Sequence, residues 1–269
     1  MSKYKSILLW CVSIILMLII VVYQRVTGPT YPKSGKIELN SEKIKYQLPR
    51  SHGGDGDEPI MIETNDNSIT GKIIFKRYPS FDEWKTVSLE RKENALITSI
   101  PHQPMAGKII YNIILTKDNK DYSLTQEPVI IRFRRSVPIA VLIFHLFFIF
   151  SAITFSIRAG FEAIFKGNNL YRLSVITCIL FFIGGIIIGP MMQKYAFDAY
   201  WTGWPFGHDL TDNKTLVAFL IWLIAVWRLK VNPLKRGWAI AASIVLLVVF
   251  LIPHSILGSE IDYTKLQPK

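Results

Sequence analysis

The chain has 269 residues, half of them hydrophobic, and a formal net charge of +11. Its mean hydropathy is positive, which is unusual for a soluble domain. The basic residues cluster beside long apolar runs, as they do in membrane proteins, and this distribution argues against nucleic acid as a partner. The two cysteines, Cys11 and Cys178, both lie inside apolar runs, so the sequence predicts no disulfide framework.

The first apolar run, residues 6–23, follows Lys3 and Lys5. It is long for the hydrophobic region of a signal peptide, and no cleavage site with small residues follows it. We therefore interpret residues 1–24 as an uncleaved signal anchor, a transmembrane helix with its N-terminus in the cytoplasm. Residues 25–35 are rich in Gly and Pro and are typical of a linker.

Residues 36–135 have the pattern of a β-domain, because apolar and polar residues alternate and clusters of Gly, Pro, Asn and Asp separate the apolar stretches. The predicted strands are 37–47, 59–64, 71–78, 84–91, 95–99, 108–115 and 128–134. Short strands with no helical pattern between them favour an antiparallel β-sandwich. With its linkers this extracytoplasmic domain occupies 25–136.

Part of this domain resembles a known module. Ala95 to Pro101, followed by Pro104, Gly107 and Tyr111-Asn112-Ile113, is similar to the E-to-F region of immunoglobulin-like and fibronectin-III-like domains. The resemblance implies that Tyr111 makes the corner hydrogen bond found near the start of strand F in those families. The cysteine pair of antibody domains is absent. Such modules usually serve as scaffolds or binding surfaces, and the fold does not name a ligand.

Four further apolar runs, 137–157, 173–192, 215–227 and 237–252, predict a four-helix transmembrane domain over 137–269. The expected fold class is therefore an α+β membrane protein, a five-helix transmembrane bundle with an antiparallel β-sandwich inserted between helices one and two. The fourth run is short, and it spans only if its helix begins near Asp212 and ends near Leu229.

Charges in the connecting segments orient the five runs. The segments predicted to be cytoplasmic carry nine basic residues against one acid, Glu162: Lys3, Lys5, Arg158, Lys166, Arg172, Arg228, Lys230, Lys235 and Arg236. The opposite segments, 193–214 and 254–269, carry four basic residues and five acids. The positive-inside rule predicts a bacterial inner-membrane protein with its N-terminus in the cytoplasm and its C-terminus outside. The expected partners are the lipid bilayer and other envelope proteins.

The outer loop 193–214 is the densest polar and aromatic cluster in the membrane part. Its candidate binding residues are Trp204, His208, Asp209 and Asp212, and His254 is expected at the same face. Histidine and carboxylates at short spacing can hold a metal or orient a proton transfer. The alternative is structural, with Asp212 or Thr211 capping the fourth helix and the aromatic residues forming an interfacial belt.

His145 lies well inside the second predicted span, where an ionisable side chain is a functional hypothesis. The alternative is a neutral histidine that hydrogen-bonds a neighbouring helix. His145 and His254 could ligate haem only with strong helix tilt, since their depths differ by roughly 10 Å on the helix rise. Gly185 and Gly189 form a Gly-x-x-x-Gly motif, which permits close packing within one bundle or in a dimer.

The sequence lacks a P-loop, Gly-x-Ser-x-Gly, His-Glu-x-x-His and the internal repeats of transporters. The leading hypothesis is therefore a non-enzymatic binding or assembly role in the cell envelope. The alternative is a membrane redox or cofactor-binding protein that holds haem or metal with His145, His208 or His254.

Overall fold

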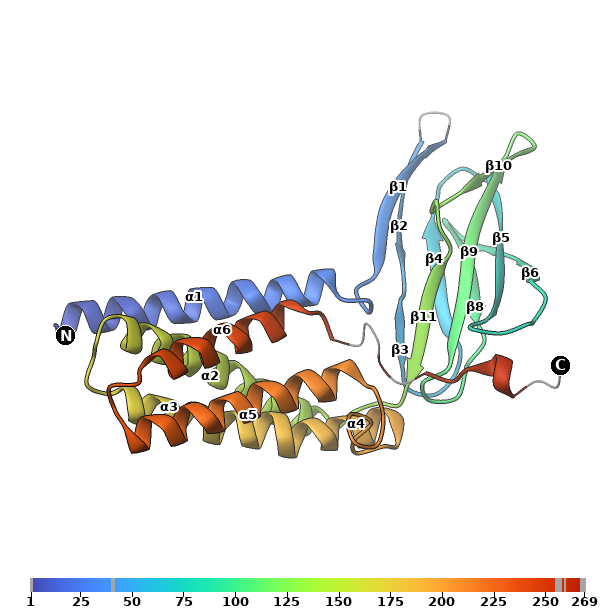
Figure 1. Cartoon of the computed structure of the whole chain (residues 1–269). Helices are drawn as coiled ribbons and strands as arrows, with labels where there is room; N and C mark the ends of the chain where they lie inside the picture. The colour runs from blue at the N-terminus through green and yellow to red at the C-terminus, as the bar shows by residue number, and fades with distance from the viewer. Residues whose placement is uncertain (1, 40–41, 255–257, 259, 267–269) are drawn as a thin grey trace. The chain divides into compact units, whose positions relative to one another are not determined.

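The computed structural model describes residues 2–39, 42–254, 258 and 260–266 (Figure 1). The chain forms two compact units. The helical unit contains Met1–Pro29 and Val137–Gly258, and the β unit contains Thr30–Ser136 and Ser259–Lys269. The β unit is therefore an insertion after the first helix, and it also takes up the segment that follows the last helix.

The described residues of the helical unit form five helical rods (Figure 1). Their elements are α1 (Lys3–Thr27), α2 (Ile139–Ile164), α3 (Leu170–Phe181), the π-helix η1 (Phe182–Ile188), α4 (Gly189–Phe197), α5 (Leu210–Val231) and α6 (Gly237–Leu251). The elements α3, η1 and α4 form one continuous rod, Leu170–Phe197. That rod, α1 and α2 are long and apolar enough to cross a membrane, and α6 is a shorter apolar helix.

Hydrogen bonds between helices define two ends of this unit. At one end, here called the basic end, Arg158 Nη2 donates to Ser6 Oγ at 3.4 Å and Arg236 Nη1 donates to the Gly167 carbonyl at 2.8 Å. At the other, called the loop end, Gln24 Nε2 donates to the Phe250 carbonyl at 3.1 Å, and Lys214 Nζ donates to the Ile252 carbonyl at 2.5 Å. α1 therefore runs from the basic end to the loop end, α5 runs back, and α6 returns to the loop end.

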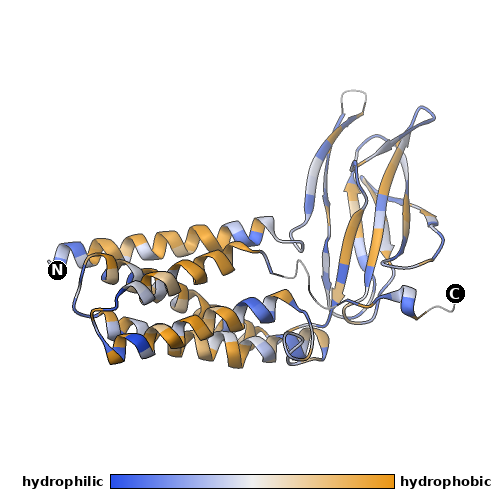
Figure 2. Ribbon diagram, in the orientation of Figure 1, coloured by the Kyte–Doolittle hydropathy of each residue, from blue (hydrophilic) through white to orange (hydrophobic). Residues whose placement is uncertain are grey.

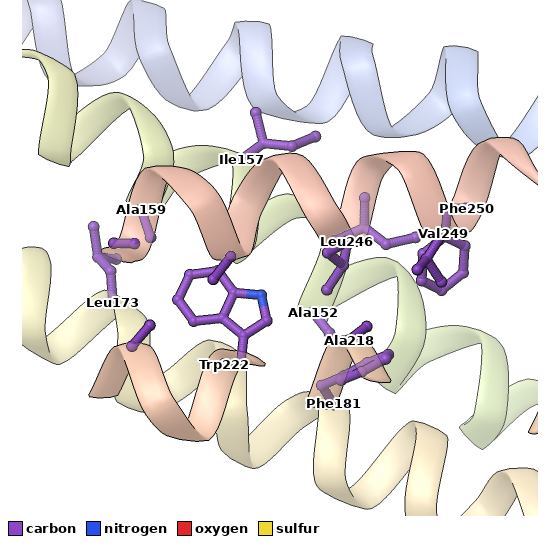
Figure 3. Packing of buried hydrophobic residues seen from close by; sticks show 14 of the residues in the cluster. Ala152, Ile157, Ala159, Leu173, Phe181, Ala218, Trp222, Leu246, Val249 and Phe250 are labelled. Atoms are coloured by element: carbon purple, nitrogen blue, oxygen red, sulfur yellow. The ribbon is translucent and has the colours of Figure 1, made fainter. Parts of the chain in front are cut away.

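Small residues allow the core helices to approach closely. Ala152, Ala239 and Ala242 are fully buried, and Ser243 Oγ donates to the Ser156 carbonyl at 2.7 Å between α6 and α2. The buried indole of Trp222 lies among these helices (Figure 3). Most of the residues along these helices are hydrophobic (Figure 2), and many large apolar side chains on the rods are exposed. An apolar exterior of this kind fits hydrocarbon better than water.

The sequence placed the second span at 137–157, with a loop from Arg158 to Arg172. That boundary is wrong, because α2 continues to Ile164 and α3 begins at Leu170. Apolar runs mark where a helix is hydrophobic, whereas backbone hydrogen bonding continues through the charged last turns. Arg158 and Glu162 therefore lie on the helix and not in a loop.

The β unit has eleven strands among its described residues (Figure 1). They are β1 (Lys33–Leu39), β2 (Glu42–Leu48), β3 (Ser51–Gly53), β4 (Glu58–Glu63), β5 (Thr70–Arg77), β6 (Lys85–Ser88), β7 (Glu90–Lys92), β8 (Ala95–Ile100), β9 (Lys108–Lys117), β10 (Lys120–Ser123) and β11 (Val129–Arg134). The order is β1-β2 in one sheet, β3-β11-β9-β5-β6 in a second, where β10 also pairs with β9, and β4-β8-β7 in a third.

Three details of the strand prediction are corrected. The predicted strand 37–47 belongs to two strands, β1 and β2, and 84–91 is divided between β6 and β7. The short strands β3 and β10 were not predicted. The pairing is antiparallel except between β3 and β11, which run parallel. Apolar alternation cannot reveal three-residue or exposed strands, because such strands bury too little surface to leave a pattern.

One hydrophobic core joins the three sheets. Alternate residues of β9, from Ile109 to Leu115, point inward, and they pack with Ile44 of β2 and Leu96 of β8. The hydroxyl of the buried Tyr111 donates to the Pro49 carbonyl at 2.8 Å, 62 residues away in sequence. A tyrosine corner instead bonds to backbone a few residues upstream. The immunoglobulin-like resemblance itself stays a prediction.

The segment after α6 completes the β unit. The Ile261 N–H donates to the Ala106 carbonyl and the Tyr263 N–H to the Pro79 carbonyl, both at 3.1 Å. Tyr263, in the short helix η2 (Tyr263–Lys265), is 4% exposed, and its hydroxyl bonds to Gln103 Oε1 at 3.1 Å. An aromatic anchor with two backbone hydrogen bonds fixes this segment on the β unit.

Candidate functional site

The polar loop between α4 and α5 is built around the carboxylate of Asp212. Asp212 is 8% exposed, and its Oδ2 accepts the N–H groups of Thr202 at 2.6 Å and Gly203 at 3.0 Å. With its amide oriented to satisfy both neighbours, Gln193 of α4 donates to the two carboxylate oxygens at 2.9 and 3.1 Å and accepts from the Thr202 hydroxyl. Asp212 therefore ties the loop to both helices.

The rest of the loop closes on itself. The Trp204 N–H donates to Asn213 Oδ1 at 2.6 Å, and the Trp201 indole donates to the Trp204 carbonyl at 3.0 Å. Gly203 is required here, since a Cβ would lie 2.6 Å from Cβ of Asp212. Trp204 and Phe206 project outward and are 69% and 83% exposed, as interfacial aromatic residues would be.

The N-cap of α5 is Asp209. Its carboxylate accepts the N–H of Thr211 at 2.8 Å and of Asp212 at 3.4 Å. The expectation that Asp212 or Thr211 caps this helix is therefore wrong. The helix begins at Leu210, one turn earlier than its apolar run suggested, because the polar residues 211–214 are helical and face the loop and the bundle.

His208 follows the turn and is exposed, and its side chain makes no hydrogen bond within the described residues. His254 follows α6 and is exposed, and its ring centroid lies 6.2 Å from that of Phe250. The roles predicted for Trp204, His208, Asp209, Asp212 and His254 in binding stay predictions. In the described part of the chain, no three His, Cys, Asp or Glu side chains gather as a metal site would require.

His145 joins two helices. Its Nδ1 lies 3.0 Å from the Gly184 carbonyl in η1, so Nδ1 carries the proton and donates. The same carbonyl accepts the Gly189 N–H across five residues, which is the π-helical pattern. Gly185 and Gly189, predicted as a packing motif in a regular helix, thus lie at the π-helical turn and its end. A bond to a neighbouring helix is the structural role that the sequence left open for His145.

A buried ion pair at the basic end was not predicted from the sequence. Arg158 Nη1 lies 2.6 Å from Glu162 Oε2, and the two side chains are 2% and 1% exposed. Glu162 Oε1 also accepts the Asn169 N–H at 3.0 Å. The i,i+4 spacing of an arginine and a glutamate was the available signal, but both residues were assigned to a loop.

The β unit carries an open groove of about 920 Å³ between β2, β4, β7 and β8. Its lining combines lysines of β2 and β7, glutamates, and the apolar side chains of Met61 and Ile97. Met61 is 61% exposed although it is large and apolar. Sequence patterns did not predict this groove, because its residues come from strands that are separated along the chain.

Comparison with known proteins adds no relative: no family model, no curated protein and no solved structure matches the chain.

Proposed function

We propose that the chain is a multi-pass protein of the bacterial inner membrane with a non-enzymatic binding or assembly role. In this proposal five helical rods span the bilayer, the N-terminal end of α1 lies in the cytoplasm, and the β unit, as a β-sandwich, lies outside. The partners are the bilayer and other envelope proteins. The observation that supports the topology of this proposal is the packing of the segment around Tyr263 onto the β unit.

That packing limits the number of membrane crossings. The β unit precedes α2, and Tyr263 follows α6, so the chain must cross an even number of times between them. The bond from Arg236 to the Gly167 carbonyl holds the α5–α6 connection at the same end as the α2–α3 connection. If α2 and the rod 170–197 cross, α5 and α6 must then cross as well. Four crossings after α1 fit the hydrogen bonds without any reference to charge.

The charges supply the orientation. The segments at the basic end hold nine basic residues and one acid, Glu162. The positive-inside rule assigns such segments to the cytoplasm. The loop 198–209 and the β unit then face the outer compartment.

The groove supports a binding role for the β unit. Exposed Met61 and half-buried Ile97 offer an apolar floor, and the flanking Lys43 and Lys45 are exposed. An apolar floor with a polar rim is the composition of a protein-binding surface. β4 pairs only with β8, which leaves its other edge without a ladder partner among the described strands.

Reporter fusions test the topology. We expect a reporter that works only outside the cytoplasm to be active after Lys120, Asp209 or Lys269 and inactive after Lys166 or Lys235. Activity after Lys235 would contradict the five-span arrangement. A photo-crosslinking residue then tests the surface: at Met61 it should capture envelope proteins, whereas at Val87, 47% exposed on β6, it should not. Equal capture at the two positions would remove the groove from the proposal.

The haem alternative makes a different prediction. We expect purified protein to have no Soret band, and a Soret band that is lost in His145→Ala would favour the cofactor hypothesis instead.

A further inference from the structure

Lys214 is a buried lysine with no carboxylate partner among the described residues. It is 6% exposed, in the first turn of α5, and Nζ donates to the Ile252 carbonyl at 2.5 Å. Within the described residues it has no ion pair and no second hydrogen-bond acceptor; Asp209 acts on it only as a more distant charge. An ammonium group has three N–H donors, so two remain. Burying a charge without a counter-ion is strongly unfavourable, and this makes an external anion the expected partner.

Two histidines lie near this ammonium group. Ile252, whose carbonyl binds Lys214, is two residues before His254. Thr215, the residue after Lys214, packs closely against η1: a Cβ added to Gly185 would lie 3.0 Å from Cγ2 of Thr215. Gly184, next to Gly185, is bonded to His145. These contacts connect α2, η1, α5 and the segment after α6 at the loop end.

The charges in this cluster interact. Packing around the ring, followed by the positive charge of Lys214 and by the His145 ring, lowers the pKa of His254. A neutral His254 can still donate one N–H. The cluster therefore offers N–H donors from Lys214 and His254, and within the described residues no carboxylate forms an ion pair with Lys214.

We propose that Lys214 and His254, with His145 nearby, bind a phosphate group at the loop end of the helical unit. Phosphate oxygens can accept several N–H donors at once, and such charge-assisted hydrogen bonds are strong. A helix end of this kind lies at the depth of lipid phosphates when the rods span a bilayer. The phosphate can belong to a lipid headgroup or to a free anion. The inference requires that the helices span the membrane, but not the orientation proposed above.

Native mass spectrometry of the full chain in detergent tests the site. The probes are dioleoyl phosphatidylglycerol, dioleoylglycerol, which lacks phosphate, and inorganic phosphate. We expect the wild type to retain phosphatidylglycerol and not dioleoylglycerol, and Lys214→Gln to weaken retention roughly tenfold or more. Lys214→Arg, which keeps the positive charge, should retain phosphatidylglycerol as the wild type does. Lys194→Gln is the matched control, since the Lys194 side chain on α4 is 40% exposed and paired with Asp198.

Each outcome decides the proposal. Equal retention by wild type and Lys214→Gln, or equal retention of dioleoylglycerol, would overturn it. Competition by inorganic phosphate supports the site and measures its preference for the free anion over the lipid. If Lys214→Gln does not fold, phosphorus NMR of the wild type replaces it, and an unshifted phosphatidylglycerol resonance would overturn the site. Reporter fusions do not depend on phosphate binding, so the proposed topology and the proposed phosphate site can each be refuted separately.

Discussion

The two ends of the helical unit differ in whether their buried charges form an ion pair. At the basic end, Arg158 and Glu162 are one helical turn apart and form a direct ion pair with 2.6 Å between the charged atoms. At the loop end, Asp212 and Lys214 are equally buried but only two residues apart in α5. Residues at i,i+2 project from different sides of a helix and cannot pair. Spacing alone therefore decides whether these charges neutralise each other.

This difference changes what each charge needs. Asp212 uses backbone and amide N–H donors in place of a cation, so its negative charge holds a loop in position. Lys214 has a carbonyl as its only described partner, and its positive charge remains for a ligand. At the basic end the buried charges of Arg158 and Glu162 neutralise each other, whereas at the loop end the buried charges of Asp212 and Lys214 stay separate.

The largest expected effect comes from breaking the pair at the basic end. Glu162→Gln leaves Arg158 buried without a counter-charge and should lower the free energy of unfolding by about 3–5 kcal/mol. Equilibrium unfolding of the purified wild type and variant in mixed micelles measures this loss of stability. The double variant Arg158→Leu/Glu162→Leu is the control, and it should recover more than half of the loss. A stable Glu162→Gln protein would contradict the burial of this pair.

A smaller effect is expected at the loop end, because water can reach the loop once it opens. Asp212→Ala leaves the N–H groups of Thr202 and Gly203 without an acceptor and should lower the free energy of unfolding by about 1–3 kcal/mol. Asp212→Asn keeps one acceptor oxygen and should lose about half as much. The same unfolding assay measures both, and proteolysis near Trp204 should become faster in Asp212→Ala. An Asp212→Asn variant as unstable as Asp212→Ala would show that the charge, not the acceptor geometry, organises the loop.

The sequence predicted the helices and most strands because each leaves a periodic pattern of apolar residues. Apolar runs located the helical rods, and alternation located β4, β5, β8, β9 and β11 to within a few residues. The same patterns could not give helix ends, since α2 and α5 extend into charged residues that are helical because of backbone bonds and caps. The five-span topology and the sandwich itself remain predictions.

The candidate site was less predictable than the fold. Asp209 and Asp212 were both candidate residues in the sequence, but their roles could be assigned only from the geometry. Asp209 caps α5, whereas Asp212 accepts hydrogen bonds from the loop backbone. Lys214 was counted only as a charge on the outer side. The contact of Tyr263 with the β unit joins residues more than 150 positions apart, and no local pattern reports it.

The smallest expected effects separate the cap of α5 from the exposed residue before it. Asp209→Ala removes the N-cap and should lower the free energy of unfolding by about 1 kcal/mol, whereas Asp209→Ser, which keeps a capping oxygen, should lose only a few tenths. His208→Ala should change it by less than about 0.5 kcal/mol, because the side chain is exposed and unbonded within the described residues. Thermal unfolding in detergent measures the three variants together. If His208→Ala instead abolished the function of the protein in the cell at a normal protein level, His208 would be a binding residue, and the loop end would then carry a second site beside Lys214.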